Sequence, residues 1–134
     1  MLINLSNHPS SGWNAVQKEA ASVYENIVDL PFPKLDPWWS IEEIDQMAAI
    51  YEMKVAEIMT NKDSGQNVVH LMGELTFCFA LSKKLQKRGI LCIASTTERI
   101  VVENGTSKIS EFRFCRFREY PRLCDFNQNS INEH

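Results

Sequence analysis

Two short, predominantly apolar runs constrain the fold of this chain most. They are VVHLM at residues 68–72 and ILCIA at residues 90–94, and the stretch between them has the length and composition of an apolar helix. Strands that are apolar on both faces are typical of parallel sheets covered by helices on each side. A strand, a helix and a second parallel strand form the unit from which such sheets are built. The two runs therefore predict the centre of an α/β domain.

The other segments extend this alternation of strands and helices. Residues 2–6 and 27–30 are short apolar runs that end in turn-forming residues, and helical spacing separates them. The capping box Ser40-Ile41-Glu42-Glu43 starts a long helix, which Asn61-Lys62-Asp63-Ser64-Gly65 is expected to end. Two β-rich segments then flank Asn104-Gly105, a dipeptide typical of a type I′ hairpin. We expect a three-layer Rossmann-like α/β sandwich with a mostly parallel sheet and a C-terminal antiparallel β-hairpin.

Length and composition limit the organisation of the chain. With 134 residues, 44% of them hydrophobic, it has room for one domain, expected at residues 1–124 and followed by a polar C-terminal tail at 125–134. No apolar run approaches the ~20 residues that cross a bilayer, and the opening MLINLSNHPS lacks the features of a signal peptide. We expect a cytoplasmic protein without a membrane partner. A net charge of -3 and the absence of a basic stripe also disfavour duplex nucleic acid.

The cysteines and the common motifs indicate neither a metal nor a cofactor. Cys78, Cys92, Cys115 and Cys124 include no C-x-x-C pair, and we interpret them as isolated buried thiols. No second His, Cys or Asp stands at ligand spacing from the loop histidine His8, so we expect no metal site. The sequence also lacks a P-loop, a G-x-G-x-x-G fingerprint and a G-x-S-x-G elbow.

Candidate site residues cluster where the predicted parallel strands end. Ligands of open α/β sheets bind outside the carboxyl ends of the strands. Ser95-Thr96-Thr97, expected in a loop with Arg99 close behind, offers hydroxyls, amides and a cation for a phosphate or a ribose, although such residues also serve plain turns. His8 is the one histidine in such a loop and could act as a general acid or base. Gly73-Glu74 is either an anion site at a helix start or a purely structural turn.

Other residues remain open to two interpretations. His70 lies inside an apolar strand, which favours a hydrogen-bonded core histidine. Trp38-Trp39 either stacks on a ligand or subunit, or packs against the apolar face of a helix. Residues 99–122 carry six basic side chains against three acidic ones, which indicates either an anion-binding segment or the solvated face of a strand.

Several short motifs occur in an order that resembles a known family. They are Asn7-His8-Pro9-Ser10, Asp29-Leu30-Pro31-Phe32-Pro33, His70-Leu71-Met72-Gly73-Glu74, Ser95-Thr96-Thr97-Glu98-Arg99 and Phe117-Arg118-Glu119-Tyr120. Together, over roughly residues 1–120, they resemble small stand-alone CRISPR-associated proteins with a Rossmann-like fold, related to the CARF domains and ring nucleases of type III systems.

This resemblance implies a homodimer that binds a cyclic oligoadenylate, with tetra-adenylate favoured, across its two-fold axis in antiviral signalling. Such a protein is a sensor or sponge of the ring, or a ring nuclease that needs no metal or cofactor. The resemblance places catalysis at His8 and Arg99. It places ligand contacts at Asn7, Ser10, Ser11, Gly73, Glu74, Ser95, Thr96 and Thr97.

Two other functions compete with this one. The same loops suit a small nucleotide- or nucleoside-processing enzyme in which His8 or Glu98 serves as acid or base. A non-catalytic interaction module would instead use Trp38-Trp39 and the arginines of the last strand, Arg113, Arg116 and Arg118, to bind a protein partner.

Overall fold

The computed structural model describes residues 1–60 and 65–123. The elements run in the order β1 (Leu2–Ser6), a 3-10 turn (Ser10–Gly12), α1 (Ala15–Ala21), β2 (Ile27–Asp29), α2 (Ile41–Thr60), β3 (Val68–Met72), α3 (Leu75–Lys87), β4 (Leu91–Asn104) and β5 (Ser107–Glu119). The predicted end of the long helix at Asn61-Lys62-Asp63-Ser64, the cysteine Cys124 and the polar tail at 125–134 lie outside the described residues.

The five strands form one sheet in the order β2-β1-β3-β4-β5. The strands β2, β1, β3 and β4 are parallel, and β5 is antiparallel to β4. The chain leaves β1 toward β2 on one side and β3 lies on the other, so the topological switch point falls between β1 and β3. The predicted α/β architecture, with a mostly parallel sheet and a C-terminal antiparallel pair, is confirmed.

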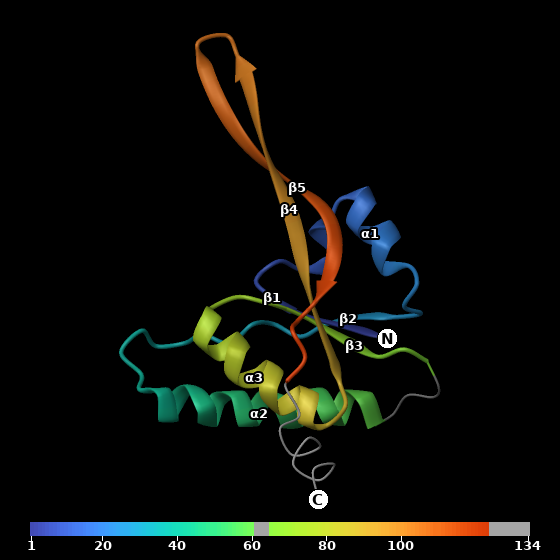
Figure 1. Ribbon diagram of the computed structural model, residues 1–134, viewed down its shortest axis with the longest axis vertical. Coiled ribbons are helices and arrows are strands. Elements are labelled where there is room, and N and C mark those ends of the chain that lie inside the picture. The colour runs from blue at the N-terminus through green and yellow to red at the C-terminus, as the bar shows by residue number, and fades with distance from the viewer. Residues whose placement is uncertain (61–64, 124–134) are drawn as a thin grey trace, which may run out of the picture.

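Helices cover both faces of the sheet, which makes the three layers (Figure 1). One core lies between the sheet and the helices α2 and α3, and includes Ile3, Leu5 and Phe77. A smaller core lies on the face covered by α1 and includes Leu2 and Trp13. The division follows from the alternation of side chains along β1, since Leu2 faces one way and Ile3 the other.

The local boundaries differ from the predicted ones in three places. The first helix ends at Ala21, although the helical spacing of apolar residues continues through Val23 and Tyr24, and β2 ends at Asp29, one residue before the predicted end. The hairpin turn is shifted by one residue, because Asn104 pairs with Ser107 and leaves Gly105 and Thr106 as the loop. Of the two, only Gly105 has a positive φ, of 66°. This pattern fits a type II′ loop, so the predicted type I′ turn is wrong.

The segment that contains Ser95-Thr96-Thr97 and Arg99 is part of a strand and not a loop. Strand β4 continues from Leu91 to Asn104, and the predicted break after the apolar run is wrong. The reason is β5, which pairs with β4 from Ile93 outward to the turn and supplies the hydrogen-bond partners that keep this segment extended. In Figure 1 the two strands leave the body of the domain together as a long hairpin.

Candidate functional site

A row of polar side chains crosses the α1 face of the sheet near the carboxyl ends of the parallel strands. The register places Asn4 of β1 between Asp29 of β2 and His70 of β3. The Asn4 amide nitrogen donates to Asp29 Oδ1 over 2.8 Å, and Asn4 Oδ1 lies 2.9 Å from His70 Nδ1. The other ring nitrogen of His70 lies 2.7 Å from the Ser95 hydroxyl on β4. We call Asp29, Asn4, His70 and Ser95 the polar row.

Hydrogen-bond chemistry determines the proton positions in the polar row. An ionised Asp29 carboxylate only accepts hydrogen bonds, so the Asn4 side chain must turn its NH₂ group toward Asp29 and its oxygen toward His70. His70 Nδ1 therefore carries the proton, and Nε2 accepts from the Ser95 hydroxyl. From α1, the Gln17 amide donates to the same Ser95 oxygen over 3.2 Å. The result is a serine hydroxyl bonded to the basic nitrogen of a neutral imidazole.

Burial sets the charge states along the row. His70 is only 3% exposed, and this burial lowers its pKa from 6.5 to about 4, which keeps the ring neutral at pH 7. Burial works to raise the pKa of Asp29, but hydrogen bonds from Asn4 and Ser10 outweigh it and lower that pKa. The row thus runs from an exposed anion at Asp29 through a buried neutral centre to a half-buried hydroxyl at Ser95.

The segment after β1 is tied to the same row. Ser10 donates to the Asp29 carboxylate from both its backbone nitrogen, at 3.0 Å, and its hydroxyl, at 2.9 Å. The backbone oxygen of His8 accepts from the Asn4 amide and from the Ser6 hydroxyl. These bonds fix the backbone of the segment while the side chains of Asn7, His8 and Ser11 remain exposed to solvent.

Strand β4 continues the polar face beyond the row. Since side chains alternate, Ser95, Thr97 and Arg99 share the α1 face of β4, and Thr96 points to the other face. The Thr96 hydroxyl there donates to the backbone oxygen of Arg116 over 3.0 Å. Arg99 lies four residues beyond Ser95, about 13 Å along the strand, so within one copy of the chain its backbone stands apart from the polar row. Its guanidinium group donates to the Ser110 hydroxyl over 3.0 Å.

Gly73 and Glu74, at the end of β3, have structural partners. A Cβ atom at Gly73 would lie 2.2 Å from the Phe32 ring, so only glycine leaves room for that ring. Glu74 is the N-cap of α3, and its carboxylate accepts from the backbone nitrogens of Thr76 and Phe77. Burial works to raise the pKa of Glu74, but these bonds outweigh it and lower the pKa. The first amides of α3 are thus already partnered by this chain's own anion.

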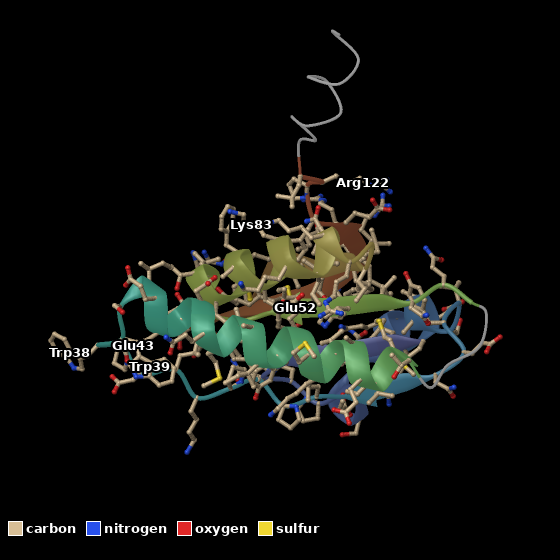
Figure 2. All side chains as sticks on the ribbon, turned by 90° about the horizontal axis from the view of Figure 1, so that it is seen from below. Trp38, Trp39, Glu43, Glu52, Lys83 and Arg122 are labelled. Carbon is tan, nitrogen blue, oxygen red and sulfur yellow. The ribbon has the colours of Figure 1, made fainter. Side chains whose placement is uncertain are left out.

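The three tryptophans have different surroundings. Trp13 is buried on the α1 face and packs edge-on against the His70 ring, with 5.3 Å between centroids. Trp39 packs against the core beneath α2 and α3, and Trp38 is 92% exposed. Figure 2 shows Trp38 directed away from the domain at the start of α2. Of the Trp38-Trp39 pair, Trp38 is therefore the exposed residue, and Trp39 is half-buried against the core.

The remaining candidates lie elsewhere on the molecule. Arg116 and Arg118 of β5 pair with Thr96 and Ala94, which places them on the face opposite the polar row. Cys78 and Cys92 are buried as predicted, and burial raises the pKa of Cys92 to about 12. Cys115 is exposed at the point where β5 has one extra residue, so its predicted burial is wrong.

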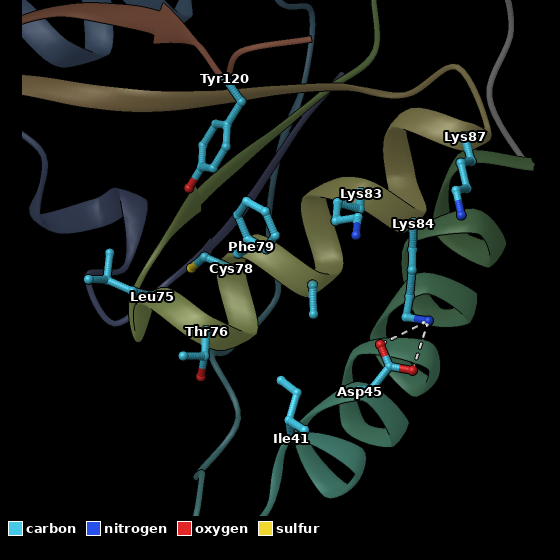
Figure 3. A pocket seen from close by; sticks show the side chains of 11 residues that line it. Ile41, Asp45, Leu75, Thr76, Cys78, Phe79, Lys83, Lys84, Lys87 and Tyr120 are labelled. Atoms are coloured by element: carbon cyan, nitrogen blue, oxygen red, sulfur yellow. Dashed lines mark hydrogen bonds and ion pairs between the residues drawn. The ribbon is translucent and has the colours of Figure 1, made fainter. Parts of the chain in front are cut away.

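The structure also has a hollow of about 820 Å³ beside α3 (Figure 3). It lies between α2 and α3 and is lined mainly by apolar side chains, including Ile41, Leu75 and Phe79. Lys84 pairs with Asp45 at its edge, with 3.3 Å between Nζ and Oδ1. Neither the polar row nor any sequence-predicted site residue lines this hollow.

Residues 1–118 match the model of the uncharacterized protein MJ1673 family. The chain belongs to this family. The matched part runs from β1 through all but the last residue of β5, and so includes every member of the polar row. No curated protein sequence and no solved structure matches the chain.

In this member of the MJ1673 family, sequence reasoning missed part of the site. The sequence patterns do not mark Asn4 or Gln17, they include Asp29 only within the motif Asp29-Leu30-Pro31-Phe32-Pro33, and they favour a core role for His70. The signal was present, because Asn4 and Ser6 interrupt an apolar strand at alternate positions and Asp29 does so in the next strand. Polar residues at alternate positions of a strand share one face of the sheet. When they occur near the carboxyl ends of neighbouring strands, they predict a polar row.

Two further observations concern the described residues. Across 1–60 and 65–123, no group of three or more His, Cys, Asp or Glu side chains is arranged to hold a metal ion. None of the helices in these two ranges is long and apolar enough to span a membrane.

Proposed function

We propose that this protein binds a cyclic oligoadenylate, with tetra-adenylate the favoured ring, as a homodimer in CRISPR antiviral signalling. The observation that carries the proposal is the polar row at the β1/β3 switch point, where open α/β sheets bind their ligands. The motif order that resembles CARF-related proteins supplies the ligand class.

The chemistry of the α1 face suits such a ligand. A cyclic oligoadenylate presents phosphates, ribose hydroxyls and adenine edges, which are bound by cations, hydroxyls and amides. Ser95, Thr97 and Arg99 offer these groups along one face of β4, and the exposed side chains of His8 and Ser11 offer more beyond β1. The about 13 Å from Ser95 to Arg99 along the strand is too long for one mononucleotide phosphate and suits a ligand with several phosphates.

The protein either holds the ring intact or opens it. Opening would proceed by attack of a ribose 2′-oxygen on the adjacent phosphorus, with loss of the 5′-oxygen and formation of a 2′,3′-cyclic phosphate. A base takes the 2′-hydroxyl proton and an acid returns one to the 5′-oxygen, and the exposed imidazole of His8 can serve in either role. Arg99 would stabilise the charge that develops on the phosphate oxygens.

The direct test is incubation of stoichiometric protein with cyclic tri-, tetra- and hexa-adenylate, followed by chromatography of free, bound and linear species. Linear product from one ring indicates a ring nuclease, and retention of the intact ring indicates a sensor or sponge. Absence of interaction with all three rings would overturn the proposal.

A matched pair of variants locates the site. Arg99→Ala removes a guanidinium group on the α1 face of β4, and Arg118→Ala removes an exposed one on the opposite face of the sheet. We expect Arg99→Ala to weaken ring binding by ~1.5–3 kcal/mol in calorimetry, the contribution of a charge-assisted phosphate contact, and Arg118→Ala to leave it unchanged. Equal affinities of the two variants would remove Arg99 from the site.

A further inference from the structure

The outer part of the β4–β5 hairpin, residues 98–113, stands clear of the rest of the domain (Figure 1). We call these residues the arm. Every residue of the arm is exposed except Ile100, which is half-buried. The last pair at its base is Thr97 and Phe114, and Phe114 is buried against Phe117 on the α1 face. The arm therefore extends from a well-packed base without a covering layer of its own.

The arm exposes apolar side chains on both of its faces. From the pairing register, Val102 and its partner Ile109 share one face with Ile100, and Val101 shares the other with Phe112. Phe112 is 70% exposed and Val101 is 54% exposed. A two-stranded hairpin with no packing partner is at best marginally stable in water, and grouped exposed apolar residues mark interaction surfaces. The composition of the arm thus indicates a contact with another molecule.

The backbone of the arm specifies what kind of molecule can cover it. Among the described residues, β4 pairs with β3 only as far as Ile93, and the outer edge of β5 pairs with no strand. Along the arm both edges therefore present unpaired N–H and C=O groups. Such edges accept another β-strand, which satisfies these groups while the neighbouring side chains are buried. The fitting partner is a chain with a free strand edge and apolar side chains beside it.

The charges of the arm distinguish between partners. Three acidic residues, Glu98, Glu103 and Glu111, balance three basic ones, Arg99, Lys108 and Arg113, so the arm has no net charge although the chain carries -3. Lys108 also pairs with Glu103 at 4.0 Å and Arg113 with Glu111 at 3.5 Å. The arm has no run of cations that could follow the backbone of a long nucleic acid. A second copy of the neutral arm can approach the first without net repulsion, and its acidic and basic side chains can pair with those of the first arm.

We propose that two copies of this chain associate through their arms, each arm covering the apolar side chains and free edges of the other. A two-fold contact requires a surface that complements itself, and the arm combines free edges, apolar centres and balanced charge in one element. The inference rests on the proposed function only for the expectation of a dimer, and it names the surface that forms it.

The main test compares two phenylalanines of similar exposure at different places. Phe112 on the arm is 70% exposed, and Phe79 on α3, at the apolar hollow, is 66% exposed. Sedimentation equilibrium of the full chain over a wide range of protein concentration should give a dimer. Phe112→Lys should raise its dissociation constant at least about 100-fold, because each of the two copies loses one buried aromatic side chain. Phe79→Lys should leave the constant unchanged.

A second variant removes the arm without disturbing its base. Residues 98–113 are replaced by Asn-Gly, a two-residue turn that joins the cross-strand partners Thr97 and Phe114. We expect a monomer with the circular dichroism and cooperative unfolding of a folded domain. If this variant does not fold, Phe112→Lys alone decides the test.

Three results would overturn the arm contact. They are a monomeric wild-type chain at all concentrations, a dimer that persists in Phe112→Lys, and a dimer that Phe79→Lys dissociates as strongly as Phe112→Lys does. Ring binding is measured separately on the same samples. A dimer that binds no cyclic oligoadenylate refutes ring binding and leaves the arm contact standing. A monomer that binds the ring refutes the arm contact and the homodimer, and leaves ring binding standing.

Discussion

Acid should destabilise this domain through His70, by an amount that follows from its burial. In the unfolded chain a histidine binds a proton as the pH falls through about 6.5, whereas buried His70 stays neutral until about pH 4. Between these values the unfolded state holds one more proton than the folded state, so the free energy of unfolding falls as the pH falls. The window of about 2.5 pH units corresponds to a loss of about 3 kcal/mol, complete near pH 4.

The measurement is urea unfolding, followed by tryptophan fluorescence, at a series of pH values between neutral and about pH 4. Wild type is compared with His70→Gln, which keeps a hydrogen-bonding side chain but does not titrate, and with His8→Gln, which removes an exposed histidine. The wild type and His8→Gln should lose about 3 kcal/mol more than His70→Gln over this window. Parallel curves for wild type and His70→Gln would refute a neutral, buried His70 and the proton positions derived from it.

Three substitutions on the α2/α3 side test the contacts described there by chemical denaturation. Gly73→Ala should destabilise the domain by about 1–3 kcal/mol, because the new Cβ overlaps the Phe32 ring, and Phe32→Leu in the same chain should recover part of that loss. Glu74→Ala should cost about 1 kcal/mol through loss of the α3 N-cap, and no change would mean that water replaces the carboxylate fully. Lys84→Met should cost less than about 1 kcal/mol, since its ion pair with Asp45 is solvent-exposed; a larger effect would show that the pair is coupled to the core.

The parts of the fold that could be predicted from sequence are those in which one physical signal dominates. The apolar runs of β3 and β4 require cover on both faces, and the capping box at Ser40 precedes α2 with the expected spacing. The prediction of a loop at Ser95-Thr96-Thr97 was wrong because the structure of this segment depends on long-range strand pairing. Ser95-Thr96-Thr97 has turn-forming composition, but the pairing of β5 with β4 holds it extended. Nothing local in the sequence reveals how far a partner strand runs.

The candidate site was predictable only in part, for a related reason. His8 and Ser10 follow a strand and were found by their position after it. The polar row depends on the register of four strands, which brings Asn4 and His70 together although they are 66 residues apart. His70 was interpreted as a hydrogen-bonded core histidine, and its hydrogen bonds to Asn4 and Ser95 are what create the row. A buried residue whose hydrogen bonds are made within the core can thus also position the side chains of a site.

The position of β1 in the sheet limits the rate at which this domain folds. The β4–β5 hairpin closes a loop of two residues, and hairpins of this kind form in about 1–10 μs. The ladder between β1 and β3 joins Leu2 to Val68 and must wait for the ends of a long intervening chain to meet. Parallel pairing across such separations slows folding by orders of magnitude relative to local pairing. The hairpin should therefore form and reopen many times before the central sheet assembles, and it should become stable only when its base packs against the rest of the domain.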